Sequence, residues 1–198
     1  MHSAAGKVVG KTMRVGNGAA AMAGGPSGVW VATRGDNTIQ RIDPLTGQPG
    51  KAIGVGAGPD GIAVDTGSVW VANGRDGTLS RIDPKTREEI SSPIRVGSGP
   101  KGIALYGDDV WVANQLDASV TRINRSTGLP RPISVGEGPG SVAVAGGAIW
   151  VSEEFAGFLT RIDPATGAVR RFWLGSSPRG LAAVGGRVWV AAGAFADP

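Results

Sequence analysis

The residues best suited to chemistry in this sequence are two adjacent carboxylates, Glu153 and Glu154, followed by the aromatic Phe155. Carboxylates can act as general acids and bases. The pair follows Trp150-Val151-Ser152, whereas the three related segments earlier in the chain continue with Asn or Thr. Neighbouring residues on a strand point to opposite faces, so we expect at most one of the two to face a ligand. The alternative is a polar loop that binds nothing.

A second acidic pattern is periodic: Asp36, Asp76 and Asp117 stand at the same place in successive segments. One interpretation is a ring of carboxylates that binds a cation. The other is a turn in which each Asp accepts a hydrogen bond from its own backbone. Recurrence at one fixed position favours the turn.

Charged residues also vary at one place in loops of otherwise constant length, where Asp60, Lys101 and Arg179 are equivalent to Gly140. Side-chain identity is what distinguishes these loops, so they are candidates for ligand contact. The full set of candidate ligand-binding residues is Arg34, Asp60, Arg75, Lys101, Glu153, Glu154, Phe155 and Arg179.

Recognised catalytic and metal-binding patterns are missing from the sequence. The single histidine is His2, near the N-terminus, and there is no cysteine. There is no G-x-S-x-G pattern, no histidine-rich metal set and no glycine loop that would cradle a phosphate at a helix start. We therefore expect no catalytic residue, no metal site and no cofactor, and we favour a protein that is not an enzyme.

The elements that position these residues come from a tandem repeat. Trp recurs at intervals of 39 to 41 residues, each time in a V/I-W-V-A/S frame. A hydrophobe-Gly pair precedes each Trp, and an Arg-Ile pair follows the first four at a constant distance. The five copies are centred on Trp30, Trp70, Trp111, Trp150 and Trp189.

Each repeat predicts four short strands. In the second repeat these are 61–64, 68–72, 78–83 and 90–96, separated by turn residues such as Asp76-Gly77. Both faces of Val69-Trp70-Val71-Ala72 are apolar, which suits a sheet that is stacked between two others. Four short strands in about 40 residues, repeated radially, describe an all-β fold, the β-propeller of five blades.

The repeat resembles YVTN-type propeller repeats and is similar to the blades of streptogramin (virginiamycin B) lyases. The resemblance rests on W-V-A-N, R-I-D-P-x-T-G and V-G-x-G-P-x-G-I-A-V, and it covers nearly the whole chain. It implies the fold more than the function, because propellers carry many functions. In the lyases, histidines with nearby glutamates perform a metal-assisted elimination, but no blade position here matches such a histidine.

The resemblance leaves two functional hypotheses of different kinds. The favoured one is a non-catalytic ligand- or protein-binding module, of a sensor or scaffold type. The alternative is a lyase-like eliminase. The other repeated residues are expected to be structural: the five Trp pack between blades, and the Arg of each Arg-Ile pair makes recurring hydrogen bonds. Trp173 stands on an outer strand, where an exposed Trp can mark a contact surface.

The domain prediction is a single propeller domain spanning 1–198, with an open question at its closure. The segment Lys11–Gly16 has the sequence of an outer strand and is expected to pair with the blade of Trp189. The fifth repeat stops before its third strand, so either this blade is incomplete or the chain is a piece of a longer propeller. Exposed strand edges would then favour weak self-association.

Composition excludes several other classes. The chain carries 20 Lys and Arg against 16 Asp and Glu, spread through the repeats rather than gathered in a patch, so we expect no nucleic-acid binding. No stretch has the length of a membrane span and Met1–Lys11 lacks a signal-peptide core, so we expect a soluble protein without membrane insertion. The sequence indicates neither the compartment nor the partner.

Overall fold

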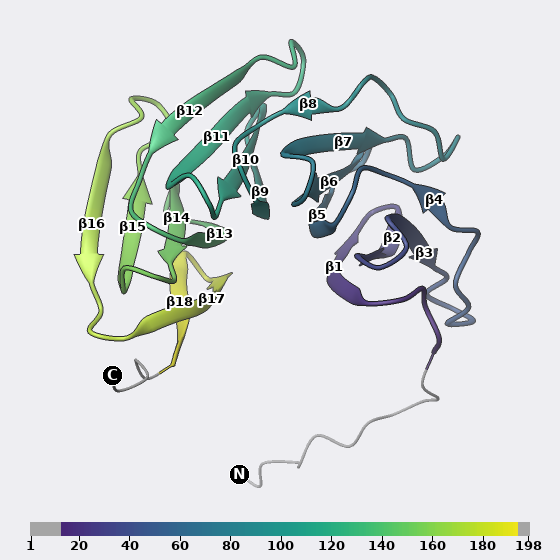
Figure 1. Ribbon diagram of the computed structural model, residues 1–198, viewed down its shortest axis with the longest axis horizontal. Helices are drawn as coiled ribbons and strands as arrows, with labels where there is room; N and C mark the ends of the chain where they lie inside the picture. Colours follow the sequence, from purple (N-terminus) through teal and green to yellow (C-terminus); the bar gives the residue numbers. More distant parts are fainter. Residues whose placement is uncertain (1–12, 194–198) are drawn as a thin grey trace, which may run out of the picture.

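The computed structural model describes residues 13–193, which fold into five antiparallel sheets arranged one after another around an arc (Figure 1). The first sheet contains β1 (Ala19–Gly25), β2 (Gly28–Thr33), β3 (Thr38–Ile42) and β4 (Ile53–Gly54). The second contains β5 (Pro59–Val64), β6 (Val69–Asn73), β7 (Thr78–Ile82) and β8 (Ile94–Arg95). The third contains β9 (Pro100–Tyr106), β10 (Asp109–Asn114), β11 (Ser119–Asn124) and β12 (Pro130–Ser134). The fourth contains β13 (Pro139–Ala145), β14 (Ala148–Glu153), β15 (Phe158–Ile162) and β16 (Val169–Trp173), and the fifth contains β17 (Ser177–Val184) and β18 (Arg187–Gly193).

These sheets are the blades that the repeat predicted, with one difference in the second blade. The first three strands fall where the sequence placed them, but the outer strand is Ile94–Arg95 rather than the whole of 90–96. Pro93 stands directly before β8. Proline has no N–H to give to a strand ladder, which explains why the regular strand begins only after it.

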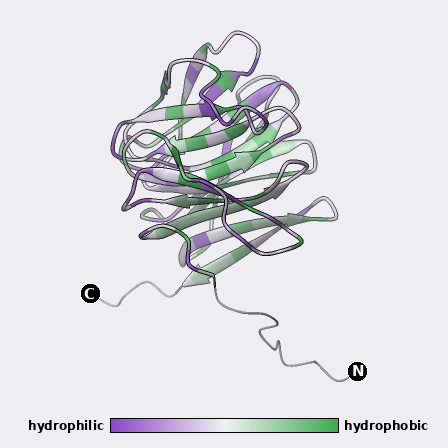
Figure 2. Ribbon diagram, turned by 90° about the vertical axis from the view of Figure 1, so that its right-hand side faces the viewer, coloured by the Kyte–Doolittle hydropathy of each residue, from purple (hydrophilic) through white to green (hydrophobic). Residues whose placement is uncertain are grey.

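Packing between blades gives the molecule its core. Trp30 is fully buried against Val69 and Val71 of the next blade, and Trp111 is buried in the same way against Ile149 and Val151. Each of the first three blades thus offers its Trp face to a Val/Ile face of the blade that follows. Figure 2 shows the hydrophobic residues distributed along the stacked strands.

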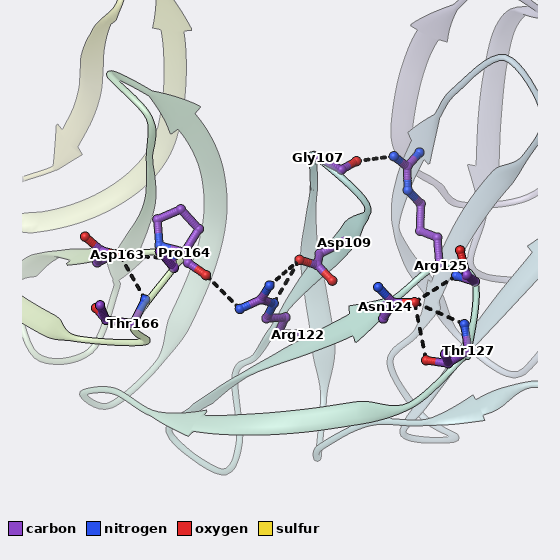
Figure 3. Close-up of polar contacts among 11 residues, drawn as sticks. Gly107, Asp109, Arg122, Asn124, Arg125, Thr127, Asp163, Pro164 and Thr166 are labelled. Atoms are coloured by element: carbon purple, nitrogen blue, oxygen red, sulfur yellow. Dashed lines mark hydrogen bonds and ion pairs between the residues drawn. The ribbon is translucent and has the colours of Figure 1, made fainter.

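Two arginines of the Arg-Ile pairs, Arg81 and Arg122, hold adjacent blades together at one end of the sheets. The Arg122 guanidinium donates to Asp109 within its own blade, from Nε to Oδ2 at 2.9 Å, and from Nη1 to the Pro164 carbonyl of the next blade at 2.7 Å (Figure 3). Arg81 similarly bonds Ser68 and the Arg125 carbonyl. Arg41 donates to the Ser27 carbonyl within its own blade. The expected hydrogen bonds are therefore present for three of the four arginines, Arg41, Arg81 and Arg122, and only those of Arg81 and Arg122 also join neighbouring blades.

The fifth blade differs from the others. Its sheet has two strands, and Trp189 is 62% exposed, whereas Trp70 is 1% exposed. The prediction that all five Trp pack between blades is therefore wrong for Trp189. The reason is that no described segment lies against the Trp face of this blade. Trp150 is half-buried and donates its indole N–H to the Ala145 carbonyl.

The expected closure through the N-terminus does not hold for the described part of that segment. Lys11 and Thr12 lie outside the described residues, and Met13 to Gly16 form no strand. The Gly16 N–H instead donates to Gln40 Oε1 within the first blade. Among residues 13–193 the β17–β18 sheet has no third strand, and no helix there is long and apolar enough to cross a membrane.

Candidate functional site

Most of the candidate residues lie at one end of the blades. Strand pairing explains this: Pro59 lies opposite Asn73, Pro100 opposite Asn114, and Pro139 opposite Glu153. The loop entering each blade and the loop after its Trp strand therefore meet at the same end. We call this end the rim. It contains Arg34, Asp60, Arg75, Lys101, Glu154, Phe155 and Arg179.

Two ion pairs at the rim join neighbouring blades. Arg34 of the first blade pairs with Asp60 of the second. Lys101 of the third blade pairs with Glu154 of the fourth, with 2.9 Å between Nζ and Oε2. Gln115 also donates to Glu154 Oε2 at 2.9 Å. The Glu154 carboxylate is thus held by two donors from the adjacent blade. Lys101 was already a candidate, but its pairing with Glu154 was not predicted.

Two glycines make room for the side chains around Glu154. A Cβ on Gly140 would collide with the Glu154 carboxylate. Gly138 has a φ of +68°, a conformation that favours glycine, and a Cβ there would lie 2.5 Å from Phe155 Cγ. The second glycine of the V-G-x-G-P pattern therefore lets the aromatic ring lie directly over the backbone.

A hollow of about 420 Å³ lies between the third, fourth and fifth blades, lined by Lys101, Glu154, Phe155, Ser177 and Arg179. Phe155 is 60% exposed at this hollow. The Arg179 side chain is exposed and forms no ion pair with any described residue. The Ser177 hydroxyl donates to the Glu154 carbonyl at 2.7 Å and so ties the fifth blade to the fourth.

Glu153 occupies a different environment from its neighbour. It is fully buried, and its carboxylate accepts hydrogen bonds from the Gly136 N–H at 2.8 Å and from the Thr160 hydroxyl. Arg171 Nη2 approaches Oε2 at 2.5 Å, and its guanidinium carbon lies 4.0 Å from the centre of the Phe158 ring. These bonds saturate the carboxylate inside the blade, so Glu153 does not line the hollow.

In the second and third blades, the position equivalent to Glu153 is occupied by Asn73 and Asn114. There the amide nitrogen donates to two hydroxyls, those of Ser119 and Thr121 in the case of Asn114. The Glu153 carboxylate at this place is paired with a cation, Arg171 on the outermost strand. The sequence could have signalled this pair through the one acidic residue among equivalent Asn and Thr positions.

The periodic aspartates bind the linker between blades. Asp36, Asp76 and Asp117 accept hydrogen bonds from backbone N–H groups of the preceding linkers, with Asp117 Oδ2 lying 2.7 Å from the Ser98 nitrogen. The favoured interpretation, a bond to the residue's own turn, is thus wrong about the donor but right about a structural role. No group of three potential metal ligands occurs within residues 13–193.

Arg75 lies apart from the other candidates. Its side chain covers Gly58, and it borders a second hollow that is also lined by Arg95 and Leu116. The structure therefore divides the candidates into four groups: the Arg34–Asp60 pair, Arg75 on its own, the buried Glu153, and the hollow around Glu154. The last group gathers the largest number of candidate side chains.

Comparisons with known proteins identify the fold. No family model matches the sequence, and no curated protein does either. Among solved structures, a streptogramin B lyase superposes with a TM-score of 0.79 at 18% identity, covering 88% of this chain and 62% of the lyase. A catalytically inactive virginiamycin B lyase from Staphylococcus aureus, with quinupristin, gives a TM-score of 0.78 at 19% identity and the same coverage.

A third neighbour belongs to another functional class. The extracellular domain of a putative one-component system from B. thetaiotaomicron matches with a TM-score of 0.62 at 22% identity, covering 79% of this chain and 24% of that one. This chain spans less than two thirds of each of these structures. At these identities the likeness concerns the fold, and the chain has the β-propeller fold found in virginiamycin B lyases.

Proposed function

We propose that this protein is a non-catalytic binding module, and that its ligand site is the rim hollow lined by Lys101, Glu154, Phe155, Ser177 and Arg179. The observation that carries the proposal is the convergence of three charged side chains and one exposed aromatic ring, from three blades, on one hollow. Rigid sheets with side chains of differing chemistry at one end are a suitable platform for selective binding.

The charges in the hollow favour a ligand with an anionic group. Lys101 and Arg179 contribute two positive charges and Glu154 one negative charge, which leaves one positive charge in excess. Glu154 already neutralises Lys101 through their ion pair, so Arg179 is the cation available to a ligand. A guanidinium can bind a carboxylate through two parallel hydrogen bonds.

Phe155 adds an apolar requirement. More than half of its surface is exposed, and the ring is supported from below by Gly138. An aromatic or aliphatic group of the ligand would bury this ring and gain the free energy of apolar burial. The proposed ligand therefore has an anionic group next to an apolar one.

A sensing or scaffolding role is consistent with one neighbour, the extracellular domain of a putative one-component system. The lyase neighbours favour the alternative, a streptogramin-lyase-like eliminase. That alternative lacks a free base in this hollow, because Glu154 is held by Lys101 and Gln115. Streptogramin turnover in the presence of magnesium that disappears in Glu154→Gln would establish the alternative.

A matched pair of probes tests the binding proposal. Phenylacetate and phenylacetamide differ in charge but share the aromatic ring, and nuclear magnetic resonance can follow the backbone amides of Phe155 and Arg179 during titration. We expect phenylacetate to bind about tenfold more tightly, because one charge-assisted hydrogen bond is worth about that ratio.

Two variants locate the effect. Arg179→Met should remove the preference for phenylacetate, whereas Arg187→Met, which removes an exposed arginine at the other end of the same blade, should preserve it. Equal binding of the two probes by the unmodified protein, or shifts confined to other blades, would contradict the proposed site.

A further inference from the structure

The outer strand of the fourth blade has an open edge that the outer strands of the first three blades lack. β4 and β8 have two residues each. β12 has five residues but includes Pro130 and Pro132. β16 also has five residues, Val169–Trp173, contains no proline and lies at the end of its sheet, on the outer side of the arc (Figure 1).

Hydrogen bonding shows which backbone groups of β16 point away from the sheet. The Leu174 N–H donates to the Gly157 carbonyl of the neighbouring strand segment at 3.0 Å. Because backbone groups alternate along an antiparallel strand, Arg170 and Phe172 also direct their N–H and C=O groups toward β15. Val169, Arg171 and Trp173 therefore direct theirs outward, where no described strand receives them.

The third blade shows what distinguishes this edge. In β12 the Val135 N–H donates inward to the Ala118 carbonyl, so the outward positions there are Pro130, Pro132 and Ser134. Proline has no N–H, and prolines on an edge strand prevent another strand from pairing with it. The two prolines of β12 thus stand where Val169 and Arg171 stand in β16.

We propose that the β16 edge binds an extended acidic peptide segment of another protein, which adds to the fourth blade as a fifth strand. This mode of recognition obtains affinity from main-chain hydrogen bonds and selectivity from alternate side chains. The site is separate from the rim hollow, because its outward groups lie on the outermost strand rather than at the loops.

Charge on one face of the edge sets the preference for acidic residues. Arg170 lies directly opposite Arg161 of β15, and neither forms an ion pair with a described residue. Arg171, on the other face, is already neutralised by Glu153. An added strand would place its side chains beside Arg170, where a glutamate offsets the repulsion between the two arginines.

On the other face of the edge, two exposed apolar side chains flank Arg171, whose charge Glu153 neutralises. Trp173 is 71% exposed and Val169 is 39% exposed, and their side chains alternate with that of Arg170. The matching peptide therefore alternates acidic and apolar residues. A second copy of this chain fits less well, because antiparallel pairing of two β16 strands would bring further arginines together without a carboxylate partner.

The test uses the 198-residue protein and a synthetic peptide of about seven alternating Glu and Val residues, the length of an ordinary strand. Amide hydrogen exchange is the readout. Binding should protect the amides of Val169, Arg171 and Trp173, whereas those of Arg170 and Phe172 are protected already. A peptide of alternating Lys and Val should bind about tenfold more weakly or not at all.

Two changes separate edge pairing from other binding. Val169→Pro copies Pro130 and removes one outward N–H, which should weaken binding about fivefold while leaving the sheet's own hydrogen bonds intact. N-methylation of the peptide on its protein-facing amides should abolish binding to the unmodified protein, so the test does not depend on one variant. The reciprocal change, Pro130→Val with Pro132→Val, should add protection at Ser134.

Three results would overturn the proposal. The first is no binding of the Glu-Val peptide, or binding that leaves the three outward amides unprotected. The second is equal binding of the Lys-Val peptide. The third is a concentration-dependent dimer that protects the same amides without peptide, which would mean that a second copy occupies this edge.

Discussion

The second and fifth blades carry a tryptophan at the same position of the repeat, but it is buried in the second blade and exposed in the fifth. Trp70 is 1% exposed, because Val110 and Val112 of the next blade cover it. Trp189 stands in an equivalent V-W-V-A segment and is 62% exposed. The strand sequence alone is therefore enough to form a hairpin, whereas burial of the tryptophan needs the neighbouring blade.

Truncation of the two tryptophans gives the largest expected contrast. Trp70→Ala should lower the free energy of unfolding by about 3–5 kcal/mol, the cost of removing a large aromatic side chain from a core. Trp189→Ala should cost less than about 1 kcal/mol, as is usual for exposed positions. Chemical denaturation of both variants measures the difference, and similar losses would mean that Trp189 is covered in solution.

Replacing the buried carboxylate of the fourth blade, Glu153, should have a smaller effect on the free energy of unfolding. This blade has the incomplete fifth blade on its Trp face, and the Glu153–Arg171 pair joins its second and fourth strands. Glu153→Gln should destabilise the protein by about 1–3 kcal/mol, a value moderated by the partial exposure of Arg171. The control is Asn114→Asp in the third blade.

That control should be at least as costly as Glu153→Gln, because the equivalent of Arg171 in the third blade is Pro132, which supplies no cation. Denaturation profiles of the two variants decide the matter. An Asn114→Asp protein as stable as the unmodified one would show that a carboxylate at this place needs no partner.

The smallest expected effect is a difference in acid sensitivity between equivalent turns of the fourth and third blades, which contain Asp163 and Asn124. Backbone N–H groups of Thr166 and Ala165 lower the pKa of Asp163 below 3.8. A lowered pKa contributes stability above pH 3.8 that is lost as the pH falls through the folded-state pKa. Asn124 makes the same turn in the third blade and does not titrate.

We therefore expect the amides of Ala165 and Thr166 to lose protection below pH 3.8, while those of Ser126 and Thr127 keep theirs. Hydrogen exchange at several acidic pH values measures both turns in one sample. Equal loss in the two turns would show that the Asp163 carboxylate does not hold its turn.

Much of the fold could be predicted from the sequence, because the repeat places β6 and β7 by local signals: the V-W-V-A frame, the Asp76-Gly77 turn and the Arg-Ile pair. Less of the candidate site could be predicted from the sequence. Position in the repeat brought Glu154, Lys101 and Arg179 into consideration, but not the fact that they share a hollow, since that depends on how three blades pack side by side.

Two errors have the same physical origin. Trp189 was expected to be buried, and Asp117 was expected to bond its own turn, yet both outcomes depend on a neighbouring segment: the absence of a described one against Trp189, and the linker at Ser98 for Asp117. Glu153 illustrates the same limit, because its partner Arg171 is separated from it by a whole strand.

Hydrogen exchange across two equivalent strands tests most directly whether contact between consecutive blades stabilises each blade. On the 198-residue chain, the amides of Val69 to Ala72, in a blade packed on both faces, should exchange far more slowly than those of Val188 to Ala191, in the blade with an exposed Trp face. Equal protection of the two strands would contradict the account, because each blade would then owe its stability to its own hairpins rather than to its neighbours.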